Sequence, residues 1–207
     1  MGAVYSFGYA VSSFIAKTFF RFRVIHRERI IEEGGAILAM NHESYLDPPF
    51  AGIACRREIY FLARKTLLDW PIIGPHFPKF NVIPVNQERA DMSALKSVIR
   101  LVRNGNCTIV FPEGARTLDG ELQPAQPGLG LVIAKTLAPV VPMRIFGAHE
   151  ALPRGGGRVR LVPVTIVVGE PIHFTKDDLQ GEGRELYQRL SDRVMERIAA
   201  IQLEEPR

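Results

Sequence analysis

A histidine and an aspartate with H-x4-D spacing stand directly after an apolar run, in the stretch MNHESYLDPPF. A histidine such as His42 can take the proton of a hydroxyl group when a carboxylate holds its ring and stabilises the imidazolium that forms. Asp47 can supply that carboxylate. The two prolines after it are also typical of a helix start, with Asp47 as N-cap and Pro48 in the first helical position. A capping carboxylate can bind backbone amides through one oxygen and the imidazole through the other, so the two roles are compatible.

A second group of charged residues lies in the stretch FPEGART, residues 111–117. Its proline and Gly114 predict an irregular turn that displays Glu113 and Arg116 and leaves backbone amides free. The planar guanidinium of Arg116 suits a phosphate, because it can bind two oxygens at once. A single charged loop is usually solvated surface. This turn and the loop of His42 both follow predicted strands, however, and the two can converge at one edge of a sheet.

A third stretch, ARKTLLDWPIIGPHF at residues 63–77, places basic residues beside apolar ones. Arg64 and Lys65 come directly after a predicted strand and are followed by a run that contains Trp70. This combination suits a substrate that is both anionic and apolar. Taken alone, the segment favours an ordinary surface pair before a core helix.

The elements that must position these residues alternate between strands and helices. Several short apolar runs carry apolar residues at both odd and even positions, which is typical of strands covered on both faces. The predicted strands are 36–40, 59–63, 81–85, 108–111, 138–145 and 159–168. The predicted helices begin at Pro48, at 92 (ending before Gly105), near Pro127 and at 184. This pattern predicts an α/β fold with a mostly parallel or mixed central sheet covered by helices on both faces.

The amino-terminal segment predicts an amphipathic helix in residues 1–23, ahead of a single domain in residues 24–207. At about 100° per residue, one face is apolar and the opposite face is polar. The apolar residues are Val4, Phe7, Val11, Phe14, Ile15, Phe19 and Phe22. The uncharged run is short for a membrane span, and the basic residues follow it, unlike those of a secretory signal. Residues 4–22 either lie in the head-group region of a membrane or cover the core of the domain.

The composition narrows the possible partners. The formal net charge of +4 allows ligands that carry phosphate. No segment concentrates basic residues with interleaved aromatic ones, which argues against nucleic-acid binding. Cys55 and Cys107 are the only cysteines and each lacks a second thiol nearby in the sequence. We expect both to be small buried hydrophobic residues in a reducing compartment, with no metal site.

Together the motifs resemble those of a known family. NHESYLD, FPEGART and VVPM at 140–143 resemble the first, third and fourth motifs of the glycerolipid acyltransferases, the 1-acylglycerol-3-phosphate (lysophosphatidic acid) acyltransferase family. An H-x4-D pattern alone is common by chance, whereas its combination with F-P-E-G-x-R is specific. The resemblance covers roughly residues 24–172.

The resemblance implies transfer of a fatty acyl group from acyl-CoA or acyl carrier protein to a hydroxyl of a lysophospholipid, foremost lysophosphatidic acid. It implies His42 as general base and Asp47 as the residue that orients it. It also implies Glu113, Gly114 and Arg116 as acceptor-binding residues, with the arginine on the phosphate. Neither a metal nor a cofactor is implied, since the acyl donor is a substrate. Lipid substrates favour a membrane-associated helix 4–22 and a peripheral location on the cytoplasmic, inner face of the cell membrane.

The chain departs from the family pattern at positions that usually contribute phosphate ligands. The strand FNVIPVN carries Asn81 and Asn86 where the second motif usually has a glycine and an arginine. Arg89, three residues later, can substitute, and we count it with Lys65 among the predicted substrate-binding residues.

Further departures are Ala115 and Thr117 in the third motif, where threonine and serine are usual, and Gln126, where a lysine is often found. These departures leave the acceptor head group open. Another lysolipid, such as lyso-ornithine lipid, is an alternative acceptor, and a non-catalytic lipid-binding protein is the alternative class.

Overall fold

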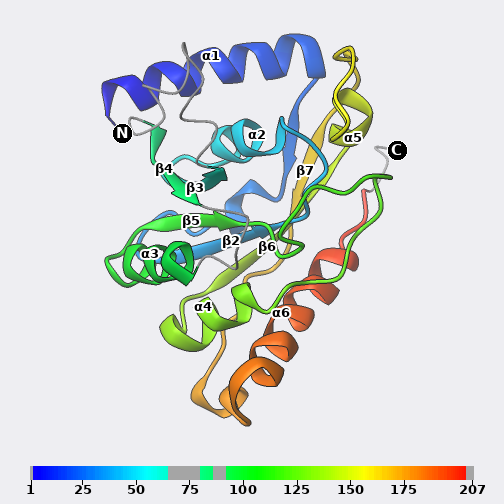
Figure 1. Cartoon of the computed structure of the whole chain (residues 1–207). Helices are drawn as coiled ribbons and strands as arrows, with labels where there is room; N and C mark the ends of the chain where they lie inside the picture. Colours follow the sequence, from blue (N-terminus) through cyan, green and yellow to red (C-terminus); the bar gives the residue numbers. More distant parts are fainter. Residues whose placement is uncertain (1, 65–79, 86–91, 204–207) are drawn as a thin grey trace.

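The computed structural model describes residues 2–64, 80–85 and 92–203, and within them seven strands form one sheet (Figure 1). All neighbouring strands are parallel except β6 and β7, which pair antiparallel. The predicted α/β class with a mixed sheet is therefore confirmed. Across the sheet the order is β1 (Arg23–Ile25), β7 (Thr165–Val168), β6 (Val140–Phe146), β2 (Ala36–Met40), β5 (Cys107–Val110), β3 (Ile59–Arg64) and β4 (Val82–Val85).

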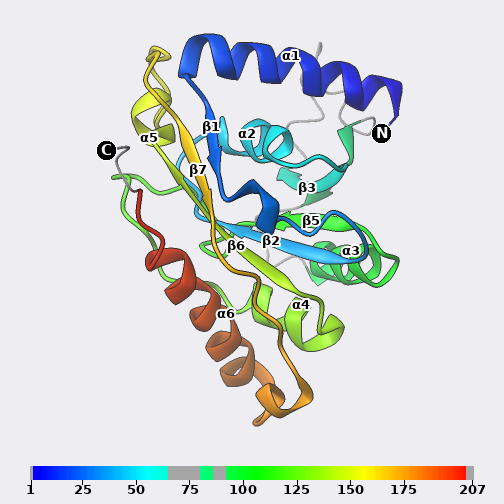
Figure 2. The same cartoon turned by 180° about the vertical axis from the view of Figure 1, so that it is seen from behind.

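The central strands are mostly apolar because helices cover both faces of the sheet (Figures 1 and 2). All residues of β2 and β5 are buried. Helices α1 (Ala3–Phe20) and α2 (Asp47–Ala54) lie on one face. The other face carries α3 (Met92–Arg103), α4 (Gly128–Thr136) and α6 (Gly183–Ala199). The short helix α5 (Ala148–Ala151) follows β6, and two 3₁₀ turns occupy Arg27–Arg29 and Lys176–Leu179.

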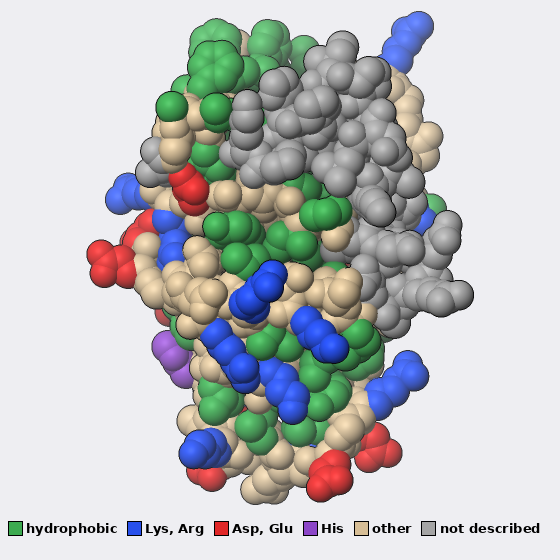
Figure 3. Space-filling model, turned by 60° about the vertical axis from the view of Figure 1, so that its left-hand side comes forward, with side chains coloured by type: hydrophobic (Ala, Val, Ile, Leu, Met, Phe, Trp, Pro, Cys, Tyr) green, Lys and Arg blue, Asp and Glu red, His purple; other side chains and the backbone are tan. Residues whose placement is uncertain are grey.

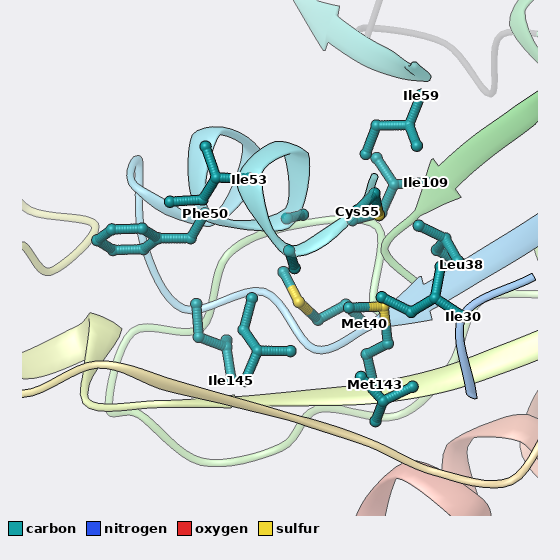
Figure 4. Close-up of a cluster of buried hydrophobic side chains, with 14 of the residues drawn as sticks. Ile30, Leu38, Met40, Phe50, Ile53, Cys55, Ile59, Ile109, Met143 and Ile145 are labelled. Atoms are coloured by element: carbon teal, nitrogen blue, oxygen red, sulfur yellow. The ribbon is translucent and has the colours of Figure 1, made fainter. Parts of the chain in front are cut away.

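Alternate residues of β2 supply the two cores. Leu38 and Met40 pack with Phe50 of α2, Ile145 and their neighbours in the cluster drawn in Figure 4. Ile37, on the opposite face, packs against α3, α4 and α6 in the second cluster. Cys55 and Cys107 are both fully buried and unpaired, as their isolated positions in the sequence predict.

The predicted strand at 159–168 is shorter than expected, since only Thr165–Val168 are in a strand. In the antiparallel pairing Thr165 lies opposite Phe146, and β6 ends there because Gly147 takes a left-handed conformation (φ 83°). The residues before Thr165 therefore have no residue of β6 opposite them to pair with. Strand β1 was not predicted, because three residues that begin with an arginine make no apolar run; its pairing with β7 defines it.

Helix α1 has its predicted apolar face turned to solvent (Figure 3, top). Phe7 and Phe14 are 71% and 67% exposed, and the other exposed members of this face are Val4, Val11, Ile15 and Phe19. The opposite face packs on the domain through Tyr5, Ala16 and Phe20. Phe22 does not belong to the exposed face, because Arg21 ends the helix in a left-handed conformation (φ 45°) and turns Phe22 onto the ring of Phe50.

Within the part of the chain that is described, no helix combines the length and the apolar character that crossing a membrane requires.

The packing of α4 on α6 depends on a glycine. The N–H of Gly130 donates to Ser191 Oγ (2.8 Å), and a Cβ at Gly130 would overlap the backbone carbonyl of Tyr187. We expect Gly130→Ala to lower the free energy of unfolding by about 1–3 kcal/mol, the usual cost of overpacking. Urea denaturation measures it. Gly155→Ala is the matched control, since no atom would lie within 4 Å of its Cβ; equal midpoints for the two variants would contradict the prediction.

Candidate active site

His42 and Asp47 form a hydrogen-bonded pair beyond the carboxyl end of β2. His42 Nδ1 lies 2.7 Å from Asp47 Oδ2, a short hydrogen-bonding distance. The Asp47 side chain is fully buried and that of His42 is 17% exposed. Because Nδ1 is engaged by the carboxylate, Nε2 is the ring nitrogen that remains for proton transfer to or from a ligand.

Asp47 is held by the loop that precedes α2, and it does not cap the helix as predicted. Its Oδ2 accepts hydrogen bonds from the backbone N–H groups of Glu43 (2.6 Å) and Ser44 (2.8 Å). Helix α2 begins at Asp47 itself, with Leu46 before it and no side-chain cap. The prediction assumed that the carboxylate faces forward to the first helical amides. Instead it turns back, so one oxygen binds both the loop and the imidazole.

The loop FPEGART meets His42, as the sequence interpretation predicts. The ring of Phe111 stacks on the imidazole with 3.8 Å between centroids and 15° between planes. The N–H of Thr117 donates to the carbonyl of His42 (2.8 Å). This convergence follows from the register, in which Ala39 of β2 lies opposite Val110 of β5 and both strands run in the same direction. The imidazole is therefore fixed by a carboxylate at its edge and an aromatic ring on its face.

A buried carboxyl group that the sequence interpretation did not single out ties this loop to β6 and α5. Glu43 accepts from Asn41 Nδ2 (2.9 Å) and from the N–H of His149 (3.2 Å). Asn41 Oδ1 in turn accepts from the N–H of Ile145 (2.8 Å). Burial, together with the nearby charge of Asp47, raises the pKa of Glu43 to about 8. Its position within a motif next to a buried strand is the only sequence signal that could have found it.

Glu113 is also buried, and its pKa is raised to about 7 mainly because burial disfavours the charged form. The backbone N–H groups of His42 and Gln123 partly offset this effect. Neither carboxylate oxygen makes a hydrogen bond of good geometry within the described residues. Gly114, beside it, has φ 73°, and its N–H closes a turn onto the Phe111 carbonyl (3.1 Å), which gives the glycine a conformational role.

Arg116 contacts the loop that carries His42, through the ring of Tyr45. Its guanidinium carbon is 3.5 Å from the centroid of the Tyr45 ring, in cation–π contact. Its Nη1 is buried and has no hydrogen-bond partner in the described part of the chain. Arg154, which the sequence interpretation did not single out, donates from Nη1 to the carbonyl of Arg116 (2.9 Å). Its loop is remote in sequence, so no local pattern indicates this contact.

The remaining predicted substrate-binding residues, Lys65 and Arg89, lie outside the described residues, as does Asn86. Asn81 is described and has φ 58°, a left-handed conformation that asparagine tolerates better than most residues. The side chain donates to Glu58 Oε2 (3.0 Å).

A family model described as Acyltransferase matches residues 21–146, more than half of the chain and all of the site described above except Arg154 and His149. The chain belongs to this acyltransferase family. The resemblance predicted from the motifs is thus confirmed at the level of the family.

Named members of the acyltransferase family are similar over most of this chain. The chloroplastic 1-acyl-sn-glycerol-3-phosphate acyltransferase BAT2 of Brassica napus is 30% identical over 146 residues, 69% of this chain and 42% of that protein. The 1-acyl-sn-glycerol-3-phosphate acyltransferase of Bacillus subtilis (strain 168) is 26% identical over 152 residues, 73% of each protein. The chain therefore spans less than half the length of the plant relative and about three quarters of the bacterial one.

Among solved structures, the crystal structure of the 1-acyl-sn-glycerophosphate (LPA) acyltransferase PlsC from Thermotoga maritima has a TM-score of 0.72 and 25% sequence identity. The likeness covers 97% of this chain and 80% of that one. It therefore extends beyond the family model, to α1 and to α6.

The raised pKa of Glu43 makes stability depend on pH. Between the ordinary carboxyl pKa of 4.5 and about 8, the folded state holds a proton that the unfolded state has released, so stability falls as pH rises through this window. Glu43→Gln removes this dependence. Relative to the parent protein, the variant should gain on the order of 2–4 kcal/mol between pH 5 and pH 8.

Urea denaturation at the two pH values measures this gain. The hydrogen bond lost in the amide variant lowers its free energy of unfolding equally at pH 5 and pH 8. Glu113 titrates in both the variant and the parent protein, so it does not contribute to the difference between them either. A gap between variant and parent that is the same at pH 5 and pH 8 would contradict the assignment.

Proposed function

We propose that the protein transfers a fatty acyl group from a thioester donor, acyl-CoA or acyl carrier protein, to the hydroxyl of lysophosphatidic acid, giving phosphatidic acid. The observation that carries the proposal is the His42–Asp47 pair, set beside Arg116 in a chain of the acyltransferase family. The names of the similar proteins from Brassica napus, Bacillus subtilis and Thermotoga maritima support this acceptor. A partly buried base beside a buried carboxylate is of no use to a protein that only binds lipid, which disfavours the non-catalytic alternative.

The chemistry needs one proton relay and no covalent enzyme intermediate. His42 Nε2 takes the proton of the acceptor hydroxyl as its oxygen attacks the thioester carbonyl. The tetrahedral intermediate then collapses, the carbon–sulfur bond breaks, and the imidazolium returns the proton to the leaving thiolate. A positioned general base contributes roughly 10² to 10⁴ in rate. Asp47 compensates the positive charge that the ring carries between the two transfers.

The surroundings of His42 hold the ring ready for this relay. The three hydrogen bonds on Asp47 Oδ2 and the stacked ring of Phe111 leave the imidazole little freedom to rotate. A base that is already oriented reacts without first losing conformational entropy. We assign binding of the acceptor to Glu113, Gly114 and Arg116, with Lys65 and Arg89 as further ligands, and we propose that the reaction uses no metal or cofactor.

We further propose that α1 lies in the head-group region of a membrane, on its inner face, as the peripheral anchor of the enzyme. Six large apolar side chains on one face of α1 are exposed while the opposite face packs on the domain. An exposed apolar stripe on a helix, with Lys17 and Arg21 nearby for anionic head groups, is typical of an interfacial helix. Lysophosphatidic acid and its product both reside in that layer.

An acceptor without a phosphomonoester, such as lyso-ornithine lipid, is the second candidate. The observation that favours it is Gln126, an uncharged side chain at a position where the family often has a lysine. The Gln126 side chain lies close to Gly114 of the third motif, since its Cγ would be 3.1 Å from a Cβ added to that glycine. The nature of the acylated product separates the two candidates.

His42→Ala should lower kcat at least about 10³-fold, and Asp47→Asn about 10²- to 10⁴-fold, because each removes one part of the proton relay. Labelled acyl-CoA or acyl carrier protein and a panel of lysolipids, with mass spectrometry of the products, measure this. His173→Ala is the matched control, since His173 is exposed and follows Ile172, which pairs with the start of β6 at the opposite end of the sheet. Full activity of His42→Ala, or acylation of no acceptor by the parent protein, would refute the proposal.

Replacing Phe7 and Phe14 together by serine should weaken binding to anionic phospholipid vesicles by at least about 100-fold, since each buried phenylalanine contributes roughly 1.5–3 kcal/mol. Vesicle sedimentation measures the partition coefficient. Met92→Ser is the control, because Met92 is also exposed (48%) but begins α3, on the other face of the sheet from α1. An unchanged partition coefficient for the double variant would remove α1 as the anchor.

A further inference from the structure

We propose that Arg154 is a second specificity-determining residue, which together with Arg116 binds the phosphate of the acceptor. This inference rests on the proposed function and deepens it. It concerns the loop after α5, which lies outside the residues 21–146 matched by the family model.

The loop of Arg154 is fixed against the catalytic loop. Ser44, three residues before Asp47, donates from Oγ to the carbonyl of Leu152 (2.7 Å) and forms an antiparallel bridge with Pro153. The next residue is Arg154, whose Nη1 donates to the carbonyl of Arg116 (2.9 Å). The loops that follow β2, β5 and α5 are thus tied together at one edge of the sheet, and each contributes to the surroundings of Arg116.

The two arginines concentrate positive charge that the protein itself does not neutralise. Neither Arg116 nor Arg154 takes part in an ion pair within the described residues. Both are partly buried, so solvent screens each charge less than it would at an exposed site. Two partly buried cations on adjoining loops are best compensated by an anion.

The donors that remain fit a phosphate monoester. A guanidinium has five N–H groups, and Arg154 uses one Nη1 donor on the Arg116 carbonyl. The Arg116 guanidinium is stacked on Tyr45 and its Nη1 has no described partner. A phosphate dianion offers three terminal oxygens, and more than one planar guanidinium is needed to balance its charge and to bind those oxygens.

Steady-state kinetics with lysophosphatidic acid tests the inference. Arg154→Gln should raise the acceptor KM about 10-fold or more while the donor KM stays unchanged, and Arg154→Lys should restore part of the loss. Arg158→Gln is the matched control, since Arg158 is exposed and lies in the same glycine-rich loop; it should behave as the parent enzyme. A 1-acylglycerol that lacks phosphate serves as a second acceptor.

A merely structural role for Arg154 would reduce acylation of both acceptors equally, and that outcome overturns the inference. An unchanged KM for lysophosphatidic acid in an active Arg154→Gln enzyme overturns it as well, and leaves the proposed function standing.

Equilibrium dialysis with labelled glycerol 3-phosphate, and separately with inorganic phosphate, tests the site without turnover. The parent protein and Arg158→Gln should bind glycerol 3-phosphate equally, and Arg154→Gln should bind it about 10-fold more weakly. If this binding pattern is found but the parent protein acylates no lysolipid, the proposed function is refuted and the phosphate site at Arg154 stands. A parent protein that binds neither phosphate probe overturns the inference, and binding of inorganic phosphate only would assign the site to free phosphate and overturn its role in acceptor recognition.

Discussion

The side chain of Asp47 is the point on which the site depends. Its Oδ2 receives the imidazole of His42 and two backbone N–H groups of the loop before α2, so the base and the loop that carries it are held by one atom. The carboxylate can do this because it sits at the first residue of a helix whose next two residues are prolines, which restrict the backbone there. Full burial of Asp47 excludes water that would compete for the same oxygen.

The parallel arrangement of β2, β5 and β6 brings the other groups to that point. In parallel strands the carboxyl ends lie at one edge, and the register sets Met40 of β2 beside Met143 of β6 and Ala39 beside Val110 of β5. The loops that leave these strands therefore meet without any long excursion. Asn41 links the first loop to β6, and the Thr117 N–H links it to the third motif.

Two carboxyl groups, Glu43 and Glu113, are buried close to Asp47. Burying a carboxyl group lowers the stability of the fold, and the hydrophobic core does not need either side chain. Burial raises the pKa of Glu43 to about 8 and that of Glu113 to about 7, so near neutral pH each carries a charge less often than an exposed carboxyl group does. This limits the negative charge beside a site that we propose receives a phosphate.

Several features followed from the sequence by itself because they depend on local rules. The apolar runs predicted the strands of an α/β sheet, the 3.6-residue period predicted α1 and its apolar face, and the H-x4-D and F-P-E-G-x-R motifs predicted the family and the His42–Asp47 contact. Tertiary structure alone decided that Asp47 binds the loop behind it, that Phe22 turns inward, and that Glu43 and Arg154 join the site. These contacts join residues from separate loops, and their geometry is set by the strand register and by the packing of helices on the sheet, which no local pattern in the chain records.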